Sequence, residues 1–132
     1  MVAINYLAVV VAGFIAFVAS AIWYIVFGKE MAKVSTAFAA QQQQRPATWK
    51  MGAVIAQSIV IAFVLAYIIA RSGATGWLDA AWIGFVLWLG LSAMQWVGSM
   101  LWEKAPLKMA LIHGGDWLLK IVLISIIIGI WK

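Results

Sequence analysis

The chain has 132 residues, of which 67% are hydrophobic and only 10% are charged, whereas about 25% of the residues of a typical soluble domain are charged. This composition excludes a soluble globular protein and predicts an integral membrane protein, with the lipid bilayer as its first partner. The net charge of +5 comes from basic residues that are scattered rather than clustered with aromatic residues, so no nucleic-acid partner is predicted. Cysteine is absent, which excludes disulfide bonds and thiolate chemistry.

The first apolar run, residues 4–27, is long enough for the roughly 20 residues that a spanning helix needs. It carries small residues at a strict four-residue spacing: Ala8, Ala12, Ala16 and Ser20. Residues four apart share one face of a helix, and small side chains on that face let a second helix approach closely. We therefore expect this face to pack against another helix.

The first loop is the one sizeable segment outside the predicted spans. Met31, Val34 and Phe38 recur in it at helical spacing, which predicts a short helix lying at the membrane interface. Residues 41–46 are polar and end in a proline, which disfavours a helical conformation in the residue before it. These residues are therefore predicted to form a solvated connector.

Three more apolar runs complete the predicted spans: residues 51–70, 79–102 and 106–131. In the short second loop, Gly73 is suited to ending the second span, and Asp79 is favourably placed at the positive N-terminus of the third. The predicted fold is an all-α membrane protein, a four-transmembrane-helix bundle with a short interfacial helix in the first loop. It forms a single integral membrane domain over residues 1–132.

The basic residues predict the orientation of the chain in the membrane. Lys120 is left out of this comparison because it lies within a span. The first and third loops carry more Lys and Arg than the opposite side does: Lys29, Lys33, Arg45, Lys50, Lys104 and Lys108, against Arg71 and Lys132. Loops rich in basic residues stay in the cytoplasm, so we expect a multi-pass protein with both termini outside.

The last predicted span carries three ionisable residues in an otherwise apolar run: His113, Asp116 and Lys120. At about 100° per residue, these side chains and Trp117 project within an arc of about 100°. An ionisable side chain at the bilayer centre costs at least about 2.5 to 3.5 kcal/mol, so it normally faces a partner or a wet cavity. Asp116 and Lys120 are four residues apart and are spaced to form an ion pair.

Each span contributes one polar residue at a similar depth. By helical rise, these residues fall roughly 9 to 11 Å into the bilayer from the cytoplasmic side: Ser20, Gln57, Gln95 and His113. Trp96 and Trp117 lie deep in their spans, and an indole N–H in hydrocarbon requires an acceptor. Together with Asp116 and Lys120, these residues are the candidates for a ligand-binding or proton-relay site.

Three interpretations of this polar layer remain open. In the first, the polar groups only satisfy one another, as in a structural or accessory subunit that packs against copies of itself or a larger membrane complex. In the second, a cytoplasm-facing pocket binds a small ligand or exchanges a proton, with His113 as the titratable group and Lys120 as the counter-charge.

The third interpretation is an enzyme in which His113 acts as a general base and Asp116 orients the His113 side chain. It has less support, because the sequence has no nucleophile motif, no phosphate-binding loop and no second histidine for a metal. We therefore predict no catalytic residue, no metal ligand and no cofactor.

Short motifs at both ends of the chain point to a family: Ile4-Asn5-Tyr6-Leu7-Ala8, Trp23-Tyr24, Phe27-Gly28-Lys29, Pro106-Leu107-Lys108 and Gly129-Ile130-Trp131. In combination they resemble the bacterial domain-of-unknown-function family 1761. The resemblance spans the chain. It implies a small four-span protein of the bacterial inner (plasma) membrane, without an assigned activity, and it transfers no catalytic residue.

Overall fold

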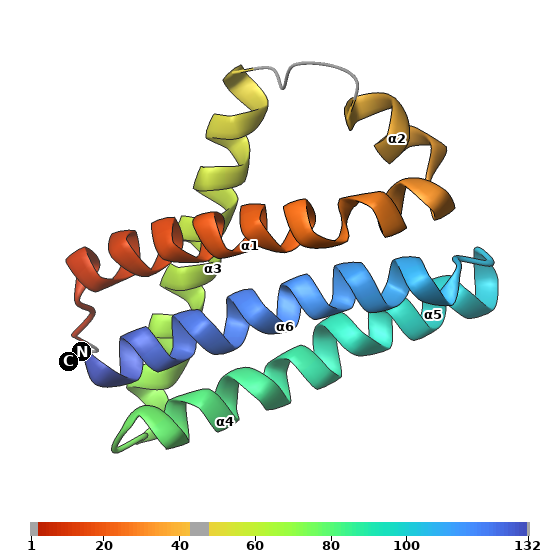
Figure 1. Ribbon diagram of the computed structural model, residues 1–132. Coiled ribbons are helices and arrows are strands. Elements are labelled where there is room, and N and C mark those ends of the chain that lie inside the picture. The colour runs from red at the N-terminus through yellow and green to blue at the C-terminus, as the bar shows by residue number, and fades with distance from the viewer. Residues whose placement is uncertain (1–2, 43–47, 132) are drawn as a thin grey trace.

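The structure is a computed structural model that describes residues 3–42 and 48–131, which form helices joined by turns (Figure 1). In chain order the helical elements are α1 (Tyr6–Val34), α2 (Thr36–Gln42), α3 (Thr48–Ser72), α4 (Trp77–Leu87), the π-helical segment η1 (Trp88–Ala93), α5 (Met94–Trp102) and α6 (Leu107–Ile130). Within this part of the chain, four stretches are long and apolar enough to cross a membrane: α1, α3, the continuous α4–η1–α5 stretch and α6. The predicted all-α architecture with four spans is confirmed.

Helix α6 is the central helix. It packs against α1, α3, α4, η1 and α5, and it is the most buried of the four long stretches. Helix α1 and the α4–η1–α5 stretch both run beside α6 in the opposite direction (Figure 1). The span with the ionisable stripe is thus the one best shielded from lipid, as the high free energy of charges in hydrocarbon requires.

Helix α3 crosses α1 steeply instead of running beside it (Figure 1). At the crossing, a Cβ added to Gly13 would lie 2.8 Å from Ile59 Cγ1 and 2.9 Å from Ile59 Cα, so the two backbones are in close contact. The predicted small-residue face of α1 is buried, which confirms its packing role: Ala8, Ala12, Ala16 and Ser20. Because α3 meets α1 at a crossing, its first half points away from α1 and α6 (Figure 1), while its second half packs in the core with α6.

The turn between α3 and α4 follows the sequence prediction. Gly73 has a φ of +78°, the left-handed conformation that ends a helix. Asp79 Oδ2 accepts hydrogen bonds from Thr75 N at 3.1 Å and from Thr75 Oγ1 at 2.9 Å. Its carboxylate lies in the first turn of α4, where the helix dipole favours negative charge. Both predicted roles are confirmed.

The short helix of the first loop is present, but it begins later than predicted. Helix α1 continues past residue 27, so Met31 and Val34 belong to α1, and only Phe38 of the predicted pattern lies in α2. The break falls at Ser35, whose Oγ accepts a hydrogen bond from Phe38 N at 3.1 Å and so caps α2. The prediction of a connector from residue 41 is wrong for residues 41 and 42, which belong to α2, and residues 43–46 of the predicted connector lie outside the described residues.

The third span contains a feature that the sequence analysis did not predict, the π-helical segment η1. Wider turns of this kind change the direction in which the side chains after them project, and they are frequent at functional sites. Trp88, at the start of η1, donates a hydrogen bond from Nε1 to the carbonyl oxygen of Gly114 at 2.9 Å. This bond supplies the acceptor that a deep indole needs and anchors η1 on α6.

Candidate functional site

A cavity of about 360 Å³ lies between α1, the first half of α3 and α6. We call it the Asp116 cavity. Five of the residues predicted from the sequence line it: Ser20, Gln57, Asp116, Trp117 and Lys120. The rest of its lining is apolar apart from Tyr24, and comprises Phe17, Ala21, Met51 and Val54. The steep course of α3 therefore brings three helices to one cavity at the depth of the polar layer.

Asp116 and Lys120 form the ion pair that their spacing predicts. Lys120 Nζ lies 3.3 Å from Asp116 Oδ2, and the two residues are 4% and 2% exposed, respectively. The same ammonium lies 4.4 Å from the centre of the Trp117 ring, within the range of a cation–π interaction. Lys120 thus has two partners, both on its own helix.

The second carboxylate oxygen of Asp116 is in a different situation. Asp116 Oδ1 is buried and has no partner at hydrogen-bond distance and angle among the described residues, although the Tyr24 hydroxyl lies close enough to interact with the Asp116 carboxylate. A buried acceptor without a donor costs about 1 to 3 kcal/mol, and more when it is charged. Because Asp116 lines the cavity, a molecule in the cavity can supply the missing donor.

His113 lies beside the Asp116 cavity rather than in its lining. Its Nδ1 is 2.5 Å from the hydroxyl oxygen of Tyr24, and the histidine tautomer decides which group donates. Trp96 stacks on the imidazole, with ring centres 5.3 Å apart and an angle of 10° between the planes. Tyr24 also contacts Phe38 of α2, and the centres of these two rings are 6.0 Å apart. Tyr24 lines the cavity and so links it to both His113 and α2.

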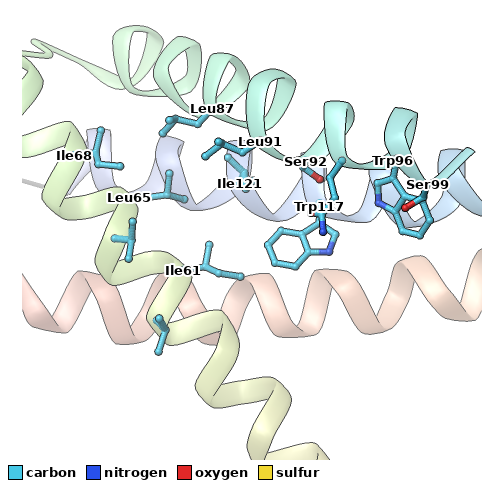
Figure 2. A pocket seen from close by; sticks show the side chains of 13 residues that line it. Ile61, Leu65, Ile68, Leu87, Leu91, Ser92, Trp96, Ser99, Trp117 and Ile121 are labelled. Carbon is cyan, nitrogen blue, oxygen red and sulfur yellow. The ribbon is translucent and has the colours of Figure 1, made fainter. Parts of the chain in front are cut away.

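A second cavity, of about 530 Å³, lies between α3, the α4–η1–α5 stretch and α6 (Figure 2). We call it the apolar cavity. Gln95 and Trp96 line it, and Trp117 lines both cavities. The structure therefore separates Gln95 from Asp116 and places the Trp117 indole between them. Of the predicted layer, Ser20 and Gln57 join Asp116 and Lys120, while Gln95 does not.

Two residues that support the site were not among the predicted candidates. Tyr24 is one, although its place four residues after Ser20 was a usable signal. The other is Trp23, whose Nε1 donates to the carbonyl oxygen of Ile112 at 2.9 Å. Its ring fills the space over Gly115, where an added Cβ would lie 2.5 Å from Trp23 Cζ2. Adjacent glycines in the last span were the signal for this close approach.

No three His, Cys, Asp or Glu side chains gather into a metal-binding group within residues 3–42 and 48–131. The sequence model of a family described as "Protein of unknown function (DUF1761)" matches residues 7–129. No curated protein and no solved structure matches the chain significantly. The matched segment includes nearly the whole of all four long helical stretches.

Proposed function

The chain belongs to the DUF1761 family, whose description assigns no activity. From the geometry of α1, α3 and α6, we propose that it is a membrane protein with a ligand-binding site at Asp116. The ligand is a small polar molecule that donates a hydrogen bond to Asp116 Oδ1. The observation that carries this proposal is that Asp116 lines a cavity and that its buried Oδ1 has no partner at hydrogen-bond distance and angle.

The charges in the cavity indicate the kind of ligand. Asp116 and Lys120 already neutralise each other at 3.3 Å. A charged ligand would bring an unpaired charge into a buried site, which costs several kcal/mol. An uncharged molecule with an N–H or O–H group avoids this cost and meets the need of Oδ1. Ser20 and Gln57 on the opposite walls offer both donors and acceptors for the rest of such a molecule.

Proton exchange is the second form of the same proposal. The Tyr24 and His113 side chains form a hydrogen-bonded pair beside the cavity, and histidine is the side chain most suited to exchanging protons near neutral pH. In this form, the occupancy of the cavity follows the protonation of His113. The six-to-two distribution of basic residues favours a cytoplasmic opening, with both termini outside the inner membrane.

A structural or accessory role is the alternative, and one observation favours it. Lys120 is satisfied by Asp116 and by the Trp117 ring, both on α6, so the ion pair needs no ligand to remain buried. On this view the protein packs against copies of itself or a larger membrane complex, and the Asp116 cavity holds only water. The two functions differ in whether the cavity distinguishes among small molecules.

Acetamide and N,N-dimethylacetamide test the proposal, because acetamide has two N–H donors and the dimethyl compound has none. We expect acetamide to raise the unfolding temperature of the purified protein in detergent relative to the dimethyl compound at equal concentration, since a ligand that binds only the folded state stabilises it. The difference should vanish in the Asp116→Leu/Lys120→Met double variant, which removes the acceptor without leaving an unpaired charge. It should persist in Glu103→Gln, a matched change outside the cavity. Equal effects of the two amides, or a difference that persists in the double variant, would contradict the proposal.

A further inference from the structure

The apolar cavity opens sideways between α3 and the α4–η1–α5 stretch. Among the described residues, no Cα atom of α3 lies within 8 Å of a Cα atom of η1 or α5. Leu91 and Val60, on the two rims, are 70% and 60% exposed. In a protein whose helices span a membrane, an opening at this position faces lipid, so lipid is the first molecule that can enter.

The length of the cavity matches one leaflet of a bilayer. Its lining on the third span extends from Leu87 to Ser99, which corresponds to about 18 Å of helical rise. Half of a hydrocarbon core is about 15 Å thick. A lipid chain entering from one leaflet therefore reaches most of the length of the cavity.

The width of the cavity decides between a lipid chain and a helix of a second copy. A volume of about 530 Å³ spread over about 18 Å leaves a channel narrower than an α-helix with its side chains, which is about 10 to 12 Å across. A helix from another copy is too wide. A single hydrocarbon chain, one methylene thick, fits.

The two ends of the cavity differ in polarity (Figure 2). Ile68 and Leu87 lie at one end and are apolar, while Ser99 lies at the other end, with Ser92 and Gln95 along the same helical stretch. The Ser99 end is the one nearest the turn between α5 and α6, where the chain leaves the apolar span. An occupant with an apolar tail and a polar head matches this order.

We propose that the apolar cavity binds one acyl chain of a phospholipid from the leaflet on the side of the α5–α6 turn, with the ester end of the chain near Ser99 and its methyl end near Leu87. This site is independent of the ligand proposed for Asp116, although Trp117 lines both cavities. The bound chain keeps water away from the Trp117 side of the Asp116 cavity.

Photo-crosslinking in vesicles tests this site directly. The protein is reconstituted in phosphatidylethanolamine and phosphatidylglycerol that contain a small fraction of phosphatidylethanolamine with a diazirine on one acyl chain, and the labelled residues are mapped by mass spectrometry. We expect labelling to concentrate at residues 60–68 and 87–99. The comparison surface is an open apolar hollow on α1, lined by Phe14, Ile15 and Val18, which we expect ordinary bilayer lipid to cover.

Matched variants separate a binding site from general lipid contact. Leu91→Trp and Val64→Trp place a large side chain in the cavity from opposite walls, at positions exposed enough to tolerate it. Each should reduce labelling of the cavity to the level at Phe14. Leu101→Trp, at a similarly exposed position outside the cavity, should leave labelling unchanged. If cavity labelling in the unchanged protein is no higher than at Phe14, or survives both Leu91→Trp and Val64→Trp, the proposal is wrong.

Discussion

Replacing either member of the Asp116–Lys120 pair alone is expected to destabilise the protein by about 3 to 5 kcal/mol, because the remaining charge stays buried without its partner. Lys120→Met leaves a buried carboxylate without its cationic partner, and Asp116→Leu leaves an ammonium with only the Trp117 ring. The Asp116→Leu/Lys120→Met double variant should be much more stable than the sum of the single changes implies. Denaturant titration of the purified protein in mixed micelles measures all three differences.

The ion pair between Glu30 and Lys108 is the matched control. Its distance of 2.6 Å is shorter than the 3.3 Å of the buried pair, but its side chains are 41% and 48% exposed. Solvent screens such a pair, so burial rather than distance decides the outcome. We expect Glu30→Gln and Lys108→Met to change stability far less than the buried changes do. Additive effects of Asp116→Leu and Lys120→Met would show that the buried charges are not energetically coupled.

The second large effect is expected at the crossing of α1 and α3. Gly13→Ala puts a methyl group 2.9 Å from the Cα atom of Ile59, and a backbone atom cannot move aside as a flexible side chain can. Forcing an extra methyl group into a packed contact typically costs about 1 to 3 kcal/mol. Because this crossing sets the course of α3, the Asp116 cavity should also change shape, and the acetamide effect should weaken.

Gly52→Ala makes the same chemical change on the first half of α3, where an added Cβ meets nothing within 4 Å. Alanine is favoured over glycine in a helix by up to about 1 kcal/mol, so this variant should be slightly more stable than the parent. Thermal unfolding of the two variants side by side gives effects of opposite sign if the packing at Gly13 is as close as described. Equal stability of the two would mean that α1 and α3 do not meet there.

The architecture and the ionisable stripe could be predicted from the sequence because both depend on local periodicity. Long apolar runs set the four spans, and a four-residue spacing on one helix is enough to pair Asp116 with Lys120. The same argument identified the small-residue face of α1 that is buried in the structure. Each of these features is decided within one helix.

Features that depend on how helices cross could not be predicted in this way. The equal depth of Gln95 and His113 along their spans predicted that they share one site. Depth alone does not give the direction in which a side chain projects, and η1 alters that direction for the side chains that follow it. Gln95 therefore lines the apolar cavity. Tyr24 was missed because its place in the site also depends on helix packing: the packing of α1 on α6 brings the Tyr24 hydroxyl to His113.

The most direct test of the central claim, that the Asp116 cavity is open to small polar molecules, is the accessibility of single cysteines. The parent chain has none, and Ser20→Cys and Ser58→Cys are nearly isosteric changes. Both serines are buried, but Ser20 lines the cavity whereas Ser58 does not. In proteoliposomes, a small methanethiosulfonate reagent added from the side of α2 should modify the cysteine at position 20, more slowly with acetamide present, and spare the one at position 58. Both cysteines should react after denaturation. If the cysteine at position 20 is as unreactive as the one at position 58, or reacts only from the opposite side, the cavity is closed to that solution and the account is contradicted.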